Sequence, residues 1–262
     1  MSTMPDPDQR RELVQFALQT MRLAGKLILS HFDTPIRVEL KQDQSPVTIA
    51  DLQAEELIRR EIESAFPQHH VIGEEFGGTM QADRFNWIID PIDGTQSFIH
   101  GVPLFGSLLA LLHGTTPIIG VIAFPALQTT AWGAVGLGAY QDGRRLHAST
   151  NTRLEEATVL CTSVGLMTDF GQAARWERLR KACRVDRAWG DCYGHFLVAS
   201  GRVDLMCDTD VKEHDILPLL PVLQEAGAQM RMLDGSQFQP RGSLFSVGNP
   251  ALADAALAIM NR

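Results

Sequence analysis

The sequence predicts an α/β protein with two unlike halves, a hairpin-rich α+β half followed by a more regular α/β half. Two amphipathic helical patterns come first, and a series of strands with short turns follows them. Beyond about residue 145, strands alternate with helices, which is typical of a sheet covered by helices. A chain of 262 residues with 45% hydrophobic residues is large enough to bury such layers. We expect residues 1–145 and 146–262 to pack as one unit, with the ligand site in the cleft between them.

The first half is expected to begin with a long helix. Its apolar residues recur near the helical period from Asp8 onward, and the helix should end before Pro35. Residues 46–49 are expected to be extended. A second helix should start near Asp51 and stop at Pro67, because proline cannot continue a helix.

Strands and further helices are expected along the rest of the chain. A short buried strand is predicted at residues 87–89, and residues 107–112 and 117–124 are predicted to pair through a turn. Another hairpin turn is expected at residues 140–144. In the second half we expect strands at 157–163 and 203–207 and helices at 170–182, 191–200 and 215–226.

Charge and composition exclude several classes of function. The formal net charge of −8 does not provide the basic patch that nucleic acid or an anionic membrane requires, so we expect neither partner. Residues 1–11 lack the order of a secretory signal, and no apolar run approaches a membrane span, so a cytoplasmic protein is expected. Free thiols are expected at all four cysteines, Cys161, Cys183, Cys192 and Cys207.

The segment 87–95, WIIDPIDGT, is the most informative part of the chain. An apolar run delivers two carboxylates, Asp90 and Asp93, into a glycine turn. Pro91 biases Asp90 toward an extended conformation, so we expect a sharp turn at the strand end that lets both carboxylates face one point. An ordinary acidic turn is the alternative interpretation of this short pattern.

Other acidic residues strengthen the interpretation as a metal site. Glu74 and Glu75 follow Gly73, and Asp51 and Asp215 stand near the starts of helical patterns. Taken singly, these are a surface pair and two helix caps. Taken together, hard oxygen ligands without cysteine or histidine suit Mg²⁺, and two such ions can neutralise a phosphoryl group and activate water. The pattern therefore favours a metal-dependent phosphatase.

Four segments resemble the inositol monophosphatase superfamily. Residues 87–95 match its W-[IV]-[IV]-D-P-[IL]-D-G-T pattern throughout, and residues 73–75 match its G-E-E element. Lys41 and residues 45–51 resemble its K-x-D-x-S-P-V-T-x-A-D element. Asp215 and residues 225–227 resemble the C-terminal W-D and E-A-G elements, with His214 in place of the tryptophan. The resemblance covers about residues 10–260 and implies a sandwich of alternating α-β-α-β-α layers.

The resemblance also implies a set of metal ligands. Glu74, Asp90 and the carbonyl oxygen of Ile92 would hold one Mg²⁺ ion. Asp90, Asp93 and Asp215 would hold a second. A third, weakly bound ion that carries the nucleophile is left open. His214 either packs as a neutral side chain or touches the substrate.

Catalytic and phosphate-binding roles follow from the same resemblance. Asp51 and Thr95 would orient and deprotonate the attacking water, and the amides of Gly94 and Thr95 would bind phosphate, because a helix start at Thr95 leaves amides free. Members of the superfamily are often dimers, so a homodimer is expected. The substrate is a small phosphate ester.

Two further segments narrow the substrate. Residues 97–106 and the string WGDCYGH at 189–195 resemble the histidinol-phosphatase branch. Histidinol phosphate carries an amine and an imidazole, so an acidic pocket wall would suit it, and Asp191 and Asp208 are the candidates. For Asp191, helix capping is the other expected role, and the two roles are compatible. We expect a magnesium-dependent histidinol-phosphate phosphatase of histidine biosynthesis; an inositol-1-phosphate or broad sugar-phosphate phosphatase and a non-catalytic phosphate-binding regulatory module are the alternatives.

Side chains near these motifs are expected to belong to the core. Cys192 is interpreted as a small buried residue beside the site, and Tyr193 as a packing aromatic. The same interpretation applies to the methionines and tryptophans of the later strands and helices, namely Met206, Met230, Met232, Trp132, Trp176 and Trp189.

Overall fold

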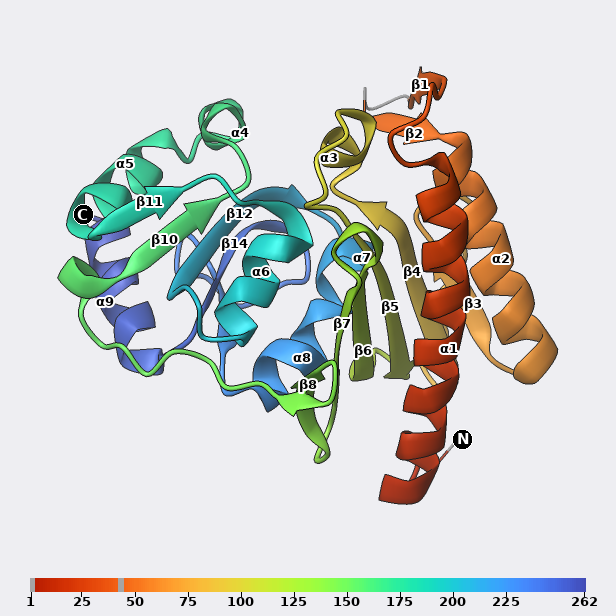
Figure 1. Ribbon diagram of the computed structural model, residues 1–262. Helices are drawn as coiled ribbons and strands as arrows, with labels where there is room; N and C mark the ends of the chain where they lie inside the picture. Colours follow the sequence, from red (N-terminus) through yellow and green to blue (C-terminus); the bar gives the residue numbers. More distant parts are fainter. Residues whose placement is uncertain (1–2, 42–44) are drawn as a thin grey trace.

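Two β-sheets and their covering helices form five layers in the computed structural model, which describes residues 3–41 and 45–262 (Figure 1). Helices α1 and α2 cover one face of the first sheet, α6 and α8 lie between the two sheets, and α5 and α9 cover the outer face of the second sheet. This order confirms the expected α-β-α-β-α sandwich. The prediction that residues 1–11 lack the order of a secretory signal includes residues 1 and 2, which lie outside the described residues.

The first sheet contains seven strands in the order β3-β4-β5-β6-β7-β8-β9. Strand β3 is parallel to β4, and each later neighbour is antiparallel, which confirms the hairpin-rich first half. The strands are β3 (His70–Gly73), β4 (Phe85–Asp93), β5 (Gly106–His113), β6 (Thr116–Phe124), β7 (Thr129–Ala134), β8 (Gly138–Gln141) and β9 (Arg144–Arg145).

Helices α1 (Pro7–His31) and α2 (Ile49–Ala65) bury their apolar stripes on this sheet. Met21 of α1 and Ile58 of α2 pack with Trp87 of β4 in one buried cluster. A short antiparallel hairpin, β1 (Val38–Leu40) with β2 (Pro46–Thr48), connects the two helices. The 3₁₀ turns are Pro125–Leu127 and Leu154–Glu156, and the short helix α3 spans Thr95–Ile99.

The second sheet contains five strands in the order β11-β10-β12-β14-β13. Strand β10 is parallel to both its neighbours, whereas β14 is antiparallel to β12 and β13. Its strands are β10 (Thr158–Cys161), β11 (Val185–Arg187), β12 (Leu205–Val211), β13 (Gln229–Met232) and β14 (Gly242–Val247). The helices of this half are α4 (Val164–Asp169), α5 (Ala173–Ala182), α6 (Asp191–Ala199), α7 (Glu213–Ile216), α8 (Leu219–Glu225) and α9 (Pro250–Met260).

Helix α8 packs closely on the first sheet. A Cβ atom at Gly120 of β6 would lie 2.0 Å from the carbonyl oxygen of Pro218, so only glycine fits at this crossing. The carboxylate of Glu225 also accepts 2.8 Å hydrogen bonds from the amides of Gly136 and Gly138. These contacts join the two halves. The last strand of the first sheet ends at Arg145, and the first strand of the second sheet begins at Thr158. The boundary between residues 145 and 146 stays a prediction.

Several element predictions need correction. The expected single helix at 215–226 is wrong, because the chain forms α7 and α8 with Pro218 at the break. The expected sharp turn beside Pro91 is also wrong. Strand β4 continues to Asp93, and the turn falls at Gly94, which has the left-handed φ of 84° that glycine adopts without strain.

The core predictions hold with one exception. Trp189 is 42% exposed, so its assignment to the core is wrong, whereas Met206 and Trp176 are buried. All four cysteines are free, as expected. Among the described residues, no helix is both long and apolar enough to cross a membrane.

Candidate metal and substrate site

Parallel pairing of β3 and β4 places Glu74 beside Asp90. Gly73 lies opposite Ile89 in the register of the two strands, and the amide of Glu74 donates a 3.1 Å hydrogen bond to the carbonyl oxygen of Ile89. Because parallel strands have their carboxyl ends at the same edge, the residues that end each strand converge. The first two acidic motifs therefore meet through ordinary sheet pairing.

A bulge in β4 turns Asp90 and Asp93 toward the same point. In a regular strand, residues three apart lie on opposite faces of the sheet. Here the pairing with β5 shifts between Asp90 and Asp93, and the shifted stretch contains Pro91, which has no amide to donate. The bulge, rather than a turn, brings the two carboxylates together.

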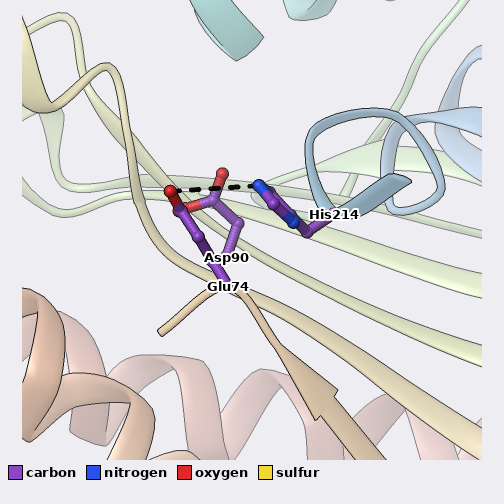
Figure 2. Close-up of side chains that lie close together, drawn as sticks. All are labelled: Glu74, Asp90 and His214. Carbon is purple, nitrogen blue, oxygen red and sulfur yellow. Dashed lines mark ion pairs between the residues drawn. The ribbon is translucent and has the colours of Figure 1, made fainter. Parts of the chain in front are cut away.

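Helix α7 of the second half completes two groups of candidate metal ligands. Asp215 joins Asp90 and Asp93, and His214 joins Glu74 and Asp90; within each group the ligand atoms all lie within 4.8 Å of one another. Figure 2 shows the second group, with the His214 ring facing the two carboxylates. The amide of Lys212 holds Asp215 by donating a 2.7 Å hydrogen bond to its Oδ2 atom.

Burial makes these carboxylates suitable for a cation. Asp90 is 1% exposed, and its Oδ1 atom has no hydrogen-bond partner among the described residues. Burial, and then the charges of Glu74, Asp93 and Asp215, raise the pKa of Asp90 well above its usual value. Burial likewise raises the pKa of Asp93 and of Asp215. An orphaned buried oxygen within a set of hard ligands fits a divalent metal ion.

Lys41 forms an ion pair with both acids of the G-E-E element. Its ammonium lies 2.7 Å from Oε1 of Glu74 and 2.8 Å from Oε1 of Glu75. Burial alone would lower the pKa of Lys41, but the charges and hydrogen bonds of the two glutamates raise it overall. Burial raises the pKa of Glu75 to about 7, although Lys41 opposes that change.

Glu55 is a structural residue of the site that the sequence analysis did not identify. Its side chain is fully buried and accepts hydrogen bonds from the amides of Glu75 (2.7 Å) and Phe76 (3.1 Å). Arg59, one turn later in α2, donates to the same carboxylate at 2.8 Å. Glu55 thereby fixes the backbone beside Glu74. The sequence does contain a signal for it, because Glu55 lies on the apolar stripe of α2 with Ile58 and Ile62.

Asp51 belongs to α2, which packs on β4, and Thr95 directly follows the Gly94 turn at the end of β4. Asp51 is buried in the first turn of α2, where its Oδ2 atom accepts hydrogen bonds from the amide (2.8 Å) and hydroxyl (2.6 Å) of Thr48. Burial raises the pKa of Asp51. The hydroxyl of Thr95 donates a 3.1 Å hydrogen bond to the carbonyl oxygen of Ile92. Gly94 is the N-cap of α3, which confirms the expected helix start at Thr95.

The N-terminus of α6 meets the end of β4. The amide of Cys192 donates a hydrogen bond to Oδ2 of Asp93, and a Cβ atom at Gly94 would lie 3.0 Å from Oδ2 of Asp191. Asp191 is the first residue of α6 and has a left-handed φ of 53°, whereas Gly190 is the N-cap. The capping alternative for Asp191 is therefore wrong.

A cavity of about 180 Å³ opens beside the ligand group of Asp90, Asp93 and Asp215. Asp93 and Asp215 line it together with Asp191 and Asp208, so acidic side chains surround this cavity. Burial, followed by the charges of Asp208 and Asp215, raises the pKa of Asp191 to about 7. Asp208 is held in place by a 2.9 Å hydrogen bond from the Thr209 amide.

His195 also lines this cavity, and the sequence analysis did not identify it. It is 1% exposed, its Nδ1 atom lies 2.8 Å from Oγ of Ser246, and its Nε2 atom lies 3.6 Å from Oδ2 of Asp208. His195 follows Asp191 by four residues, so the two side chains lie on one face of α6. This four-residue spacing is the feature of the sequence from which His195 could have been predicted.

Comparison with known proteins agrees with this geometry. Residues 9–261 match the inositol monophosphatase family. The chain belongs to this family. A histidinol-phosphatase from Chlorobaculum parvum is 41% identical over 82% of this chain and 83% of its own length. A histidinol-phosphatase from Mycobacterium tuberculosis is 37% identical over 86% of this chain and 88% of its own length.

The fold is shared with inositol monophosphatases. The structure of such an enzyme from Zymomonas mobilis superposes with a TM-score of 0.85 at 30% identity, covering 96% of this chain and 98% of its own. As a member of the inositol monophosphatase family with histidinol-phosphatase relatives, the protein is an enzyme, a phosphoric monoester hydrolase that acts on small phosphate esters.

Proposed function

We propose that this enzyme is a Mg²⁺-dependent phosphatase that hydrolyses histidinol phosphate to histidinol and phosphate. The observation that carries the proposal is the acidic cavity next to the candidate metal ligands, lined by Asp191 and Asp208. Histidinol phosphate has an amine and an imidazole that can be cationic, and hydrogen bonds between cations and carboxylates are strong. A polyol phosphate has no group that needs such a wall. The names of the two curated relatives support the same substrate.

The proposed metal ligands are those that the family resemblance implies. Glu74, Asp90 and the Ile92 carbonyl oxygen would hold one Mg²⁺ ion. Asp90, Asp93 and Asp215, which lie together in one ligand group, would hold the second. When bound, Mg²⁺ supplies charge neutralisation for the phosphoryl oxygens and the leaving oxygen, and lowers the pKa of water. Two ions are proposed, with a third left open.

The protein's own groups would align the reaction. Asp51 is buried, and the charge of Glu74 contributes to its raised pKa, so we assign Asp51, with the Thr95 hydroxyl, to orient the attacking water and accept its proton. The amides of Gly94 and Thr95 at the start of α3 would bind the phosphate oxygens. Asp191 and Asp208 would bind the cationic end of the substrate and hold it against the metal side of the cavity.

A substrate panel tests the proposal. Purified enzyme is assayed for phosphate release from histidinol phosphate, inositol 1-phosphate and fructose 1,6-bisphosphate, with Mg²⁺ and with chelator. We expect kcat/KM to be highest for histidinol phosphate and chelator to abolish turnover. Equal turnover of inositol 1-phosphate would reject the narrow substrate assignment. Failure to hydrolyse any of the three esters would reject the proposed substrates.

Replacement of Asp191 by Asn tests the acidic wall. The change keeps the shape of the side chain and removes its charge, so KM for histidinol phosphate is expected to rise by roughly tenfold or more, from the loss of a charge-assisted hydrogen bond. Inositol 1-phosphate serves as the internal control, because its turnover should change little. An equal loss for both esters would remove the proposed recognition role of Asp191.

A homodimer is proposed for the assembly, as the family resemblance implies. Light scattering on the purified protein tests it directly. A mass of roughly twice the chain mass of 28.9 kDa is expected. A mass equal to one chain would exclude the dimer.

A further inference from the structure

His214 places an imidazole among the candidate metal ligands. It belongs to the short helix α7, next to Asp215, and its side chain is 18% exposed. Its Nε2 atom lies 3.3 Å from Oδ1 of Asp215 and 3.9 Å from Oε1 of Glu74. In Figure 2 the ring faces the carboxylates of Glu74 and Asp90, which come from the other half of the molecule. The imidazole therefore lies between the two acidic groups.

The spacing of these atoms suits shared coordination of one ion. The ligand atoms of Glu74, Asp90 and His214 all lie within 4.8 Å of one another. Metal–ligand bonds are about 2.0–2.2 Å long, so the ligands of one ion lie roughly 3–4.4 Å apart. The geometry is therefore close to that of a metal site and needs only small side-chain movements.

Asp90 provides an independent indication of a ligand at this point. Its Oδ1 atom is buried and without a hydrogen-bond partner among the described residues, although a buried carboxylate oxygen is costly to leave unpaired. Asp90 also belongs to both ligand groups. An ion at the Glu74 and His214 side would satisfy the carboxylate that both groups share.

We propose that His214 is a further ligand of the ion at Glu74 and Asp90, and that this position binds Mn²⁺ or Zn²⁺ more tightly than the Mg²⁺ that also occupies it. The proposal rests on the metal-dependent hydrolysis proposed above for the same site. Imidazole nitrogen is a good ligand for Zn²⁺ and other transition metals, whereas Mg²⁺ strongly prefers oxygen. The other position, formed by Asp90, Asp93 and Asp215, has carboxylate ligands alone and stays suited to Mg²⁺. The two positions would thus differ in metal preference.

Pulsed electron paramagnetic resonance of bound Mn²⁺ tests the proposal without any substrate. Protein with ¹⁴N histidine is expected to show nitrogen modulation on Mn²⁺, and protein labelled with ¹⁵N only at histidine should show the ¹⁵N pattern instead. His214→Gln is expected to abolish the modulation. His195→Gln is the matched control, because His195 lines the neighbouring cavity and its loss should leave the modulation unchanged.

Each outcome of this measurement is decisive. Identical spectra for the two labelled forms of the wild-type protein would overturn the proposal, and this comparison requires no variant that must fold. Retention of the histidine modulation in His214→Gln, or its loss in His195→Gln alone, would assign the nitrogen to another residue and also overturn it.

Metal titration by calorimetry provides a second readout. His214→Gln is expected to weaken the tighter Mn²⁺ and Zn²⁺ binding event by roughly tenfold or more. Mutation of a residue that only hydrogen-bonds to a metal ligand already lowers metal affinity by about 10–100-fold. Mg²⁺ affinity should change much less. Equal losses for all three ions would contradict a selective nitrogen ligand.

The test separates this inference from the proposed function. Histidine modulation in a protein that hydrolyses no phosphate ester would leave the metal ligand in place and reject only the activity. An active phosphatase without histidine modulation would retain the activity and reject His214 as a ligand.

Discussion

Asp93 connects the two halves of the molecule within the site. It ends β4 in the first half, accepts a hydrogen bond from the Cys192 amide of the second half, and groups with Asp90 and Asp215. One carboxylate oxygen therefore holds α6 in place while the side chain takes part in the candidate metal position. Its two roles can be separated by experiment.

Asp93→Asn is expected to reduce kcat/KM by about 100-fold or more. The amide retains an oxygen that can accept from Cys192, but it removes the negative charge that a divalent ion requires. Phosphate release at saturating Mg²⁺ measures the loss. Asp254→Asn, an exposed position on α9, is the matched control and should retain full activity. Activity of Asp93→Asn close to that of the wild type would contradict the assignment of Asp93 as a ligand.

At the scale of elements, the loop after β3 depends on a carboxylate that α2 supplies. Glu55 accepts hydrogen bonds from the amides of Glu75 and Phe76, and a Cβ atom at Gly73 would lie only 1.9 Å from Oε1 of Glu55. The glycine of the G-E-E element is thus required by the approach of a buried side chain. The two glutamates that follow it are positioned as a consequence.

Gly73→Ala is expected to destabilise the protein by roughly 2–4 kcal/mol and to lower activity. The added methyl group would displace Glu55 and leave two amides of the loop without their acceptor. Urea denaturation measures the free energy of unfolding. Gly165→Ala in α4 is the control, since its nearest contact would be an ordinary 3.4 Å and alanine favours a helix by up to about 1 kcal/mol. Equal stability of the two variants would show that the Glu55 contact does not constrain Gly73.

Strand β4 shows the limit of prediction at this scale. The sequence indicated that Asp90 and Asp93 face one point, and this is confirmed by their place in one ligand group. The predicted cause was wrong: the sequence indicated a sharp turn at Pro91, whereas the structure has a bulge within a longer strand. The pairing partner of β4 decides between the two, because β5 continues the ladder as far as Asp93.

On the scale of the whole molecule, folding concentrates buried carboxylates at the junction of the two halves. Burial raises the pKa of Asp51, Asp90, Asp93, Asp191 and Asp215. Such a cluster opposes folding while its members are charged, because each carboxylate loses solvation and repels the others. A bound divalent cation would offset both costs.

Mg²⁺ is therefore expected to raise the thermal midpoint, and chelator to remove the increase. An ion present at 100 times its Kd stabilises the folded state by about 2.7 kcal/mol, which corresponds to roughly 5–10 °C for a domain of this size. Differential scanning fluorimetry with and without Mg²⁺ measures the shift. Asp93→Asn should show a much smaller shift. An increase of the same size in that variant would argue that Mg²⁺ stabilises the protein elsewhere.

The family, the layered fold and most of the candidate ligands were predictable from the sequence alone. Glu74, Asp90 and Asp93 lie in short motifs at the ends of neighbouring strands, so local pattern and simple sheet pairing suffice to bring them together. The helices of the first half were predicted for a similar reason, because helical periodicity and proline positions are local properties of the chain.

Packing between the layers determines which groups Glu55, His195 and His214 contact. Each of the three side chains meets a partner on a distant element. Glu55 accepts from an amide beside Glu74, and His195 lies next to the carboxylate of Asp208. His214 groups with the carboxylates of Glu74 and Asp90. A side chain with one ordinary role in its own helix acquires another when a different layer packs against it. Spacing along α2 and α6 marks Glu55 and His195 as inward-facing, but the groups that they contact depend on how the whole core packs.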